Sequence, residues 1–269
     1  GLTEPIDECL QCLFEAAETI AHQEKVALLI VKDFEQKSRP VLAFLEKQGF
    51  CRLEGLPLTE MTLDFKTFDQ YLAKLSYASR YDLRRKFRKV DGKINISFEV
   101  LESLSGPLLK EAHALYRQAV DTHELGFETM PETFFENIGK NMPGRAKFFL
   151  WRVDGKPAGF AFCLVEGGLF VDYYVGFDYK IAHTHHLFFI RFRDLLNWCL
   201  QNGMTRYEMG YTSYEVKRRL GFGLLPMDIY VKHRGKIVNR LVGFFVRRLH
   251  FERFDPALRE FKEKWHDKK

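Results

Sequence analysis

One stretch of the chain joins glycine-marked turns to a lysine- and arginine-rich helix, and its residue types are the best suited to chemistry. Residues 206–222 read Arg-Tyr-Glu-Met-Gly-Tyr-Thr-Ser-Tyr-Glu-Val-Lys-Arg-Arg-Leu-Gly-Phe. The pattern predicts a strand over Thr205–Met209, a sharp turn at Gly210, and a helix that ends where Gly221 can adopt a left-handed conformation. Because ligands of open α/β sheets bind beyond the carboxyl ends of strands, we expect a site beside this corner.

Lys217 is the residue of this helix that we expect to bind a ligand. Val216 and Leu220 are four residues apart and predict a buried stripe, and Lys217 lies off that stripe. A lysine beyond a strand end could bind an oxyanion or a phosphate. The alternative is a solvated basic face, since Arg218 and Arg219 follow directly.

Acidic and phenolic side chains near two predicted strands are further candidates. Asp172 interrupts an apolar strand, where a carboxylate is costly unless it is paired. Asp172 and Tyr173 alternate in direction, so one of them should face a cleft, and an exposed hairpin position is the alternative interpretation. Glu208 and Tyr211 lie at the end of the next predicted strand.

Positive charge is concentrated between Arg80 and Lys89, where six of ten residues are cationic. Leu83, Phe87 and Val90 keep helical spacing, which separates an apolar face from a basic one. The basic face could bind tRNA or another polyanion, and a solvated connecting helix is the alternative. The residues that would contact a polyanion are Arg84, Arg85 and Arg88.

A second basic segment lies near the C-terminus. The helix predicted over Ile237–His250 is amphipathic, and Phe244, Phe245 and Phe251 are interleaved with its cations. It could make peripheral contact with an anionic membrane or dock on the core of its own domain. A charged helix is predicted over Pro256–Lys269.

Composition indicates a soluble globular protein. The formal charge of +5 over 269 residues allows an anionic partner without requiring one, and no DNA partner is expected. Five scattered cysteines favour reduced thiols and a cytoplasmic location. No secretory signal or apolar run of membrane-spanning length is visible.

Residues 94–232 predict the element order β-α-α-β-β-β-α-β-α-β, an antiparallel meander that passes into a βαβ pattern. Asp154-Gly155 and Gly167-Gly168 mark the hairpins of the meander. The predicted strands are Ile94–Leu101, Lys147–Val153, Ala158–Val165, Leu169–Val175, Thr205–Met209 and Leu224–Lys232. The longest helix is expected over His183–Gln201. This order excludes a doubly wound sheet.

An internal repeat links the two ends of the chain. Phe44–Phe50 reads Phe-Leu-Glu-Lys-Gln-Gly-Phe, and Val216–Phe222 reads Val-Lys-Arg-Arg-Leu-Gly-Phe. Each segment ends the second helix of the same plan, which is a long helix, a short strand, a helix, Gly-Phe and a further strand. The strand of the first copy, Val26–Val31, is an apolar run typical of a buried strand. Opening strands have no counterpart before the first copy, so truncation or degeneration of a first domain is expected. The expected parts are a partial back-half domain (1–76), a basic linking helix (77–92), a complete domain (93–234) and basic amphipathic helices (235–269).

Taken in order, these features resemble the GNAT acyltransferase fold, especially the bacterial BioF2-like acetyltransferase group and its relatives, the Fem-type peptidoglycan aminoacyl transferases. The resemblance is carried by Leu75-Ser76 with Arg80, Arg84, Arg85 and Lys86, by the segments 155–160 and 172–176, and by Gly210, Lys217 and Gly221. It covers about half of the chain. It implies an α+β fold with a GNAT-like mixed sheet flanked by helices, in a tandem GNAT arrangement whose first domain is incomplete.

The resemblance also implies an N-acyltransferase that moves an activated acyl group from a thioester to an amine acceptor. Acyl-CoA or another acyl carrier would be a co-substrate, with no cofactor held tightly. The catalytic residues would be Lys217, which binds the oxyanion, together with Asp172, Glu208 and Tyr211, the last two orienting the amine or acting as a base.

The chain departs from the GNAT pattern at the turn that wraps the coenzyme A pyrophosphate. GNAT enzymes place glycines there, whereas residues 179–186 read Tyr-Lys-Ile-Ala-His-Thr-His-His. Backbone amides at the helix start could still hold a phosphate. The residues expected to bind the acyl carrier are Lys180, His183, His185, Val175 and Gly176. The histidines at 183, 185 and 186 do not share one helix face, so no metal site is expected.

Two other functions are compatible with the sequence. One is an aminoacyl-tRNA-dependent, Fem-type ligase that acts on a peptide or peptidoglycan precursor. The other is a non-catalytic GNAT-like scaffold that binds RNA or membrane through its basic helices.

Overall fold

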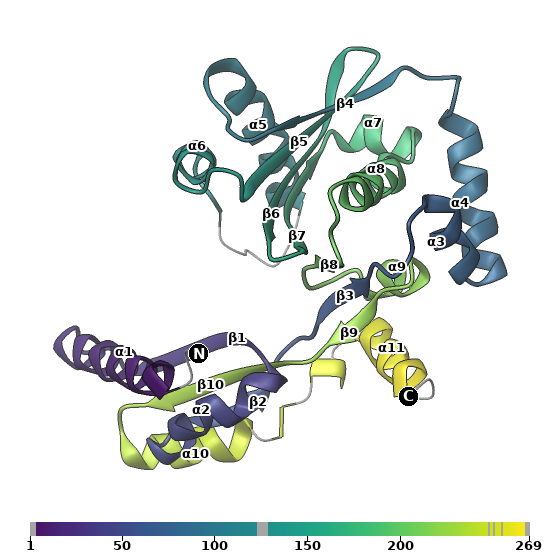
Figure 1. Cartoon of the computed structure of the whole chain (residues 1–269). Coiled ribbons are helices and arrows are strands. Elements are labelled where there is room, and N and C mark those ends of the chain that lie inside the picture. Colours follow the sequence, from purple (N-terminus) through teal and green to yellow (C-terminus); the bar gives the residue numbers. More distant parts are fainter. Residues whose placement is uncertain (1–3, 123–128, 247, 250, 254, 267–269) are drawn as a thin grey trace. The chain divides into compact units, whose positions relative to one another are not determined.

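The structure of the protein is a computed structural model that describes residues 4–122, 129–246, 248–249, 251–253 and 255–266 (Figure 1). It confirms the predicted α+β fold class. The chain forms two compact units. Unit 1 comprises Gly1–Leu58 with Leu224–Lys269, and unit 2 comprises Thr59–Gly223.

Unit 1 is built on a three-stranded antiparallel sheet with the strand order β1-β10-β2. Its elements are α1 (Glu4–Gln23), β1 (Leu28–Glu35), α2 (Arg39–Lys47), β2 (Cys51–Glu54), β10 (Met227–His233), α10 (Lys236–Val246) and α11 (Pro256–His266). Its buried core cluster consists of Phe14, Leu42, Leu45, Phe50 and Tyr230. The unit therefore has a small core made mainly by α1, α2 and the central strand.

The expectation that Val26–Val31 forms a buried strand is wrong in one respect. The strand exists, but Ile30 is 56% exposed and Leu28 is 40% exposed. Leu29 and Val31 pack on the core of unit 1 instead. The other sheet face meets α10 at β10 and β2, so the apolar side chains of β1 on that face stay in contact with solvent.

Helix α10 turns most of its apolar stripe outward. Its close approach to β2 is at Gly243, where an added Cβ would lie 2.7 Å from the Cys51 sulfur. Large apolar residues on the exposed side are Ile237, Val238, Leu241, Phe244 and Phe245. The predicted end of this helix at His250 lies outside the described residues, as do the last three residues of the predicted C-terminal helix.

Unit 2 carries the larger sheet, whose strands run in the order β4-β5-β6-β7-β8-β3, and β9 (Gly223–Leu225) marks the passage into unit 1. The strands are β4 (Ile96–Leu101), β5 (Ala146–Val153), β6 (Lys156–Glu166), β7 (Leu169–Phe177), β8 (Arg206–Met209) and β3 (Leu58–Thr62). β4 to β7 form the predicted antiparallel meander, β7 and β8 are parallel, and β8 and β3 are antiparallel. The sheet is therefore mixed.

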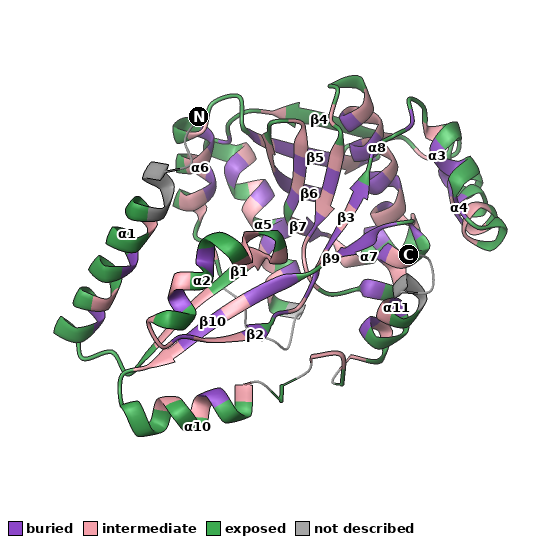
Figure 2. Cartoon of the chain, turned by 60° about the horizontal axis from the view of Figure 1, so that its bottom comes forward, coloured by how far each residue is buried: buried purple, intermediate pink, exposed green. Residues whose placement is uncertain are grey.

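Helices cover both faces of this sheet. They are α3 (Phe68–Lys74), α4 (Tyr77–Val90), α5 (Gly106–Thr122), α6 (Glu132–Asn141), α7 (Tyr179–Thr184), α8 (Leu187–Gln201) and α9 (Tyr214–Arg219). Phe148 and Leu150 of β5 pack with α5 and α6, whereas Phe149 and Trp151 pack in the core that contains α8. Because alternate residues enter opposite cores, β5 and β6 are buried over most of their length (Figure 2).

The internal repeat is present in the topology. The succession α1-β1-α2-β2 corresponds to α8-β8-α9-β9, and the sheet orders β1-β10-β2 and β8-β3-β9 match. In each case the middle strand comes from the other part of the chain. Strand β3 follows β2 in the sequence but pairs with β8. Strand β10 follows β9 in the sequence but pairs with β1 and β2. This exchange puts the unit boundaries at 58/59 and 223/224, whereas the sequence pattern suggested 76/77, 92/93 and 234/235.

Two predicted elements are interrupted. The helix expected over His183–Gln201 is α7 followed by α8, and the break lies at His186, which has a left-handed φ of 51°. The strand expected over Leu224–Lys232 is divided into β9 and β10 by Pro226. Proline lacks the N–H that a continuous strand ladder requires.

Candidate active site

A buried carboxylate lies in the middle of the larger sheet. Asp172 of β7 is 6% exposed. Its Oδ1 accepts a hydrogen bond from Nη2 of Arg191 on α8, and its Oδ2 accepts one of 3.0 Å from the Tyr207 hydroxyl on β8. Both carboxylate oxygens are therefore engaged, and three elements of unit 2 are tied together in its core.

A bulge in β7 decides which side chain faces inward. Cys163 pairs with Asp172 and Phe162 pairs with Tyr174, so Tyr173 is the extra residue on β7. Asp172 consequently points into the core that contains α8, while Tyr173 is 55% exposed. Of the two orientations that the sequence allowed, the structure shows the one with Asp172 inside.

The parallel strands β7 and β8 pair only over a short length. Their register runs from Leu169 opposite Arg206 to Asp172 opposite Met209, after which β7 continues to Phe177 without β8 beside it. Val175 and Gly176 lie on this continuation. At Gly176 an added Cβ would come within 2.4 Å of the α5 backbone, so the glycine permits close packing of α5 on β7.

Lys217 is buried at the end of α9. It is 5% exposed, and its Nζ donates to the carbonyl oxygens of Gly210 and Tyr211, the second at 3.2 Å. Burial lowers the pKa of Lys217 from 10.5 to about 8, against the opposing effect of Asp172 and with a smaller contribution from Arg191. An ammonium group has three N–H donors. Two of them donate to the carbonyl oxygens of Gly210 and Tyr211.

The corner that Lys217 holds is made differently from the prediction. Thr212 and Ser213 have left-handed φ angles of 73° and 51°, whereas Gly210 is not among the residues with positive φ. Ser213 precedes α9 without a side-chain capping bond. Consecutive left-handed residues other than glycine are strained, and such strain is often found at functional sites.

Arg191 and Tyr207 complete the network, and neither was among the residues predicted for the site. Arg191 is 1% exposed, and its Nε and Nη1 have no hydrogen-bond partner in the described part of the chain. Burial alone would lower its pKa, but the Asp172 carboxylate outweighs that effect and raises it. Burial, followed by the charge of Asp172, raises the pKa of Tyr207. One signal was readable, because Arg191 stands between Leu187 and Leu195 on one apolar stripe.

Glu208 lies on the other face of the sheet. Glu208 is level with Val171, whereas Tyr207 is level with Phe170 on the face that contains Asp172. Across the strand pair Glu208 stands opposite Glu60, and Oε2 of Glu60 is 3.1 Å from Nη1 of Arg206. The structure therefore places Lys217 within the electrostatic influence of Asp172, contributes Tyr211 through its carbonyl, and puts Glu208 on the other face of the sheet.

The start of α8 is surrounded by positive charge. Lys180 and His183 are exposed on α7, and His185 and His186 are half-buried just before α8. Burial, then the charges of Lys89, Lys86 and Arg85, lower the pKa of His186. One face of α4 therefore lies close to the N-terminus of α8, whose first amides suit an anion.

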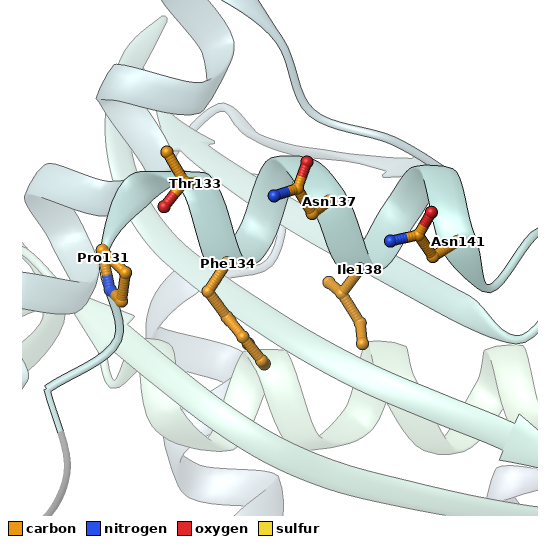
Figure 3. Close-up of a pocket in the computed structure, with 6 residues that line it drawn as sticks. All are labelled: Pro131, Thr133, Phe134, Asn137, Ile138 and Asn141. Atoms are coloured by element: carbon orange, nitrogen blue, oxygen red, sulfur yellow. The ribbon is translucent and has the colours of Figure 1, made fainter.

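Two surface pockets lie apart from this network. A hollow of about 390 Å³ lies beside α6, where Thr133, Asn137 and Asn141 follow one another at four-residue spacing (Figure 3). A second cavity lies between α3 and α4. Neither is lined by Lys217 or Asp172. Over the described residues, no group of His, Cys, Asp or Glu could hold a metal ion, and no helix is long and apolar enough to cross a membrane.

Comparison with known proteins places this site in a family context. The family model described as "Acetyltransferase (GNAT) domain" matches residues 78–218, just over half of the chain. Two curated proteins of Mycobacterium tuberculosis, both called "Putative 8-amino-7-oxononanoate synthase 2", are 22% identical over 239 residues, which is 85% of this chain and 30% of theirs. The chain thus spans less than a third of the length of these relatives.

Several solved structures share the fold. FemX matches with a TM-score of 0.59 and 15% identity, covering 88% of this chain and 79% of FemX. L-PGS from Bacillus licheniformis matches with a TM-score of 0.59 and 14% identity, covering 86% and 76%. A tandem GNAT protein from the clavulanic acid biosynthesis pathway matches at 0.53 and 15%, covering 84% and 70%. This chain therefore shares its fold with a tandem GNAT protein.

Proposed function

The chain belongs to the acetyltransferase (GNAT) domain family, and we propose that it transfers an acyl or aminoacyl group to an amine and that Lys217 stabilises the negative charge that develops in this transfer. The observation that carries the proposal is the charge of the buried network. Arg191 and Lys217 are cationic and Asp172 is anionic, which leaves one net positive charge sealed from water. A fixed cation in a dry site stabilises a developing anion far better than one in water.

The reaction requires two proton movements. The amine nitrogen attacks the acyl carbon and loses a proton, the tetrahedral intermediate carries an oxyanion, and the bond to the carrier breaks as the leaving group accepts a proton. A lysine with a pKa of about 8 is largely protonated at neutral pH. Its pKa is also close enough to neutral pH for the lysine to donate a proton. Lys217 can therefore bind the oxyanion or protonate the leaving group through its remaining N–H.

The acyl carrier would bind along the unpaired part of β7. The backbone of Val175 and Gly176 is on that edge, and Lys180, His183 and His185 lie at the following helices. The cations of α4 that face His186, which are Lys89, Lys86 and Arg85, add positive charge where GNAT enzymes carry a glycine turn. These features support a phosphorylated co-substrate, such as acyl-CoA or another acyl carrier, that is not tightly bound.

The remaining predicted residues take different roles. Asp172 is a positioning residue, because both of its oxygens are engaged and its charge keeps Lys217 and Arg191 compatible with burial. Glu208 faces the opposite side of the sheet, beside Glu60, so it takes no part in the step at Lys217. Tyr211 supplies a carbonyl that orients Lys217.

The Fem-type alternative differs in its donor, an aminoacyl ester on tRNA, and in its peptide or peptidoglycan acceptor. The fold shared with FemX supports it without selecting it. A thermal-shift comparison of acetyl-CoA, a long-chain acyl-CoA and charged tRNA distinguishes the donors, because a ligand of the native state raises the melting temperature.

A peripheral membrane contact through α10 is a further candidate, favoured by the outward stripe of Ile237, Leu241 and Phe245. Co-sedimentation with anionic vesicles should then be lost in Leu241→Asp. Equal sedimentation of this variant and the parent protein would rule this contact out.

The role of Lys217 is tested with the donor identified in this way. Lys217→Met keeps the length of the side chain and removes its charge, and turnover should fall roughly 10²–10³-fold. Arg219→Met is the matched control, because it removes a cation from the same helix at a side chain that is 49% exposed. It should keep turnover within about twofold. Full activity of Lys217→Met, or an equal loss in both variants, would contradict the proposal.

A further inference from the structure

The outer face of α4 borders a cavity that plays no part in the chemistry above. The cavity has a volume of about 600 Å³ and lies between α3 and α4, all within unit 2. Its lining includes Tyr77, Tyr81, Arg84 and Arg88 from α4 and Phe68 and Leu72 from α3. A volume in this range suits a ligand of nucleotide size.

Two tyrosines form an open aromatic surface at this cavity. Tyr77 is 75% exposed and Tyr81 is 54% exposed, although both have large apolar rings. Their ring centroids are 6.2 Å apart and the planes are inclined by 21°, which is a stacked arrangement. Neither hydroxyl has a hydrogen bond to another described residue. The pair therefore offers both a π-face and two unused polar groups.

The arginines around the cavity divide into engaged and available ones. Arg80 donates to the last carbonyls of α3, and Arg193 binds Asp91 through two contacts of 2.9 and 3.0 Å. Arg84 and Arg88 make no hydrogen bond or ion pair with the residues that the structure describes. Being four residues apart, they are separated by about 6 Å along the helix axis. They are the cations left for a ligand.

Arg85 lies on a neighbouring face of α4 and not on the part that lines the cavity, although it directly follows Arg84. Nη2 of Arg85 binds Oδ1 of Asp82 at 2.8 Å, and Lys86 binds the other oxygen of Asp82. Arg85 does not line the cavity. The set expected from the sequence, Arg84, Arg85 and Arg88, is thus divided by the structure between two helix faces.

We propose that this cavity binds single-stranded RNA. Unstacked bases pack on aromatic rings, and arginines follow the phosphates, so stacked tyrosines beside two unpaired guanidinium groups match this ligand. A duplex would not present a free base to the rings. The two tyrosine hydroxyls are available for the 2′-hydroxyl groups that distinguish RNA from DNA. This site goes beyond the acyl transfer proposed above and is tested by binding alone.

The test is fluorescence anisotropy with a labelled twelve-nucleotide oligoadenylate RNA, titrated at several salt concentrations. Arg84→Gln should weaken binding and reduce the salt slope by about 0.7, the contribution of one phosphate contact in a single strand. Arg85→Gln removes the same charge one residue away and should leave affinity within about twofold. An equal loss in the two variants would show general electrostatic attraction and overturn the proposal.

The aromatic part is tested by Tyr81→Ala and Tyr81→Phe. Loss of the ring should weaken RNA binding about tenfold or more, whereas Phe should retain binding and reduce the preference for RNA over the DNA oligonucleotide of the same sequence. Unchanged affinity of Tyr81→Ala, or binding of coenzyme A without any binding of RNA, would overturn the assignment. Lys217→Met should bind RNA normally, so failure of the catalytic proposal and failure of this one are distinguishable.

Discussion

The helix ends at Gly49-Phe50 and at Gly221-Phe222 have the same backbone geometry in the two units. Phe50 donates to the Leu45 carbonyl at 3.0 Å, and Phe222 donates to the Lys217 carbonyl at 3.1 Å. Gly49 and Gly221 have φ angles of 92° and 87°. Both ends are Schellman motifs with a buried phenylalanine after the glycine. Leu45 and Lys217 therefore occupy corresponding positions.

The two positions differ in the cost of burying their side chains. Leu45 is 0% exposed and Lys217 is 5% exposed, so the same backbone site is buried in both units. A lysine there is costly, because a pKa of about 8 in place of 10.5 corresponds to roughly 3 kcal/mol of disfavoured charge. Unit 1 shows that the backbone motif forms with an apolar residue. The role proposed above for Lys217 in acyl transfer would account for a lysine at this position.

The buried acids of the two units also differ, because the arginines that bind them are exposed to different extents. Asp228 of unit 1 is bound by Arg39 and Arg52, whose side chains are 36% and 34% exposed. Asp172 of unit 2 is bound by Arg191, which is 1% exposed. The first network reaches solvent and tolerates loss of a partner better than the second, which is sealed.

The largest effect is expected when lysine replaces Leu45, the residue of unit 1 that corresponds to Lys217. Leu45→Lys should lower the free energy of unfolding by about 3–5 kcal/mol, because Leu45 packs in a cluster of apolar side chains. Urea denaturation measures the change. Leu45→Met is the volume-matched control and should cost less than about 1.5 kcal/mol. A Leu45→Lys protein as stable as Leu45→Met would mean that the two positions are not equivalently buried.

Removing the buried acid of each unit tests whether the exposure of its arginine partners matters for stability. Asp172→Asn leaves Arg191 charged and unpaired in the core and should cost about 3–5 kcal/mol, whereas Asp228→Asn should cost less because its arginines can turn to water. Chemical denaturation of both variants gives the two values. Equal losses would show that exposure of the arginines does not matter here. The double variant Asp172→Leu/Arg191→Leu should recover part of the stability lost in Asp172→Asn.

The pH dependence of stability isolates Lys217. Its folded pKa of about 8 lies below its ordinary value of 10.5, so between these pH values the folded chain binds fewer protons than the unfolded chain. The free energy of unfolding should therefore rise with pH across this window by roughly 3 kcal/mol relative to Lys217→Met. Below pH 8 the penalty is fully present. Parallel stability curves for the two proteins from pH 7 to 10.5 would refute the shift.

Local sequence patterns predicted a large part of the fold. Asp154-Gly155 and the Gly-Phe pairs mark backbone turns by residue type alone, and the apolar spacing of α4 placed Leu83 and Phe87 inside. The repeat between the two chain ends was also visible as sequence. These features depend on neighbours within a few residues, which is why they could be predicted.

The site was predicted less completely. Lys217 was predicted from its position beyond a strand end and Asp172 from its place in an apolar strand, whereas Arg191 was not predicted, because a cation on an apolar stripe has no local sign of its partner 19 residues away. The division of Arg84 from Arg85 depends on which face of α4 borders the cavity, since Asp82 belongs to α4 itself and binds Arg85 from three residues away. Helical spacing alone does not settle that choice.

By itself, the sequence determined the elements, the caps and the residue types that could act. Only the tertiary structure decided that β3 and β10 exchange sheets, that Lys217 is buried, and that its pKa is lowered to about 8. Strand propensity does not specify a partner strand, and desolvation depends on atoms brought in from distant parts of the chain. A lysine identical in local sequence would keep its ordinary pKa on an exposed helix, so its chemistry comes from the fold around it.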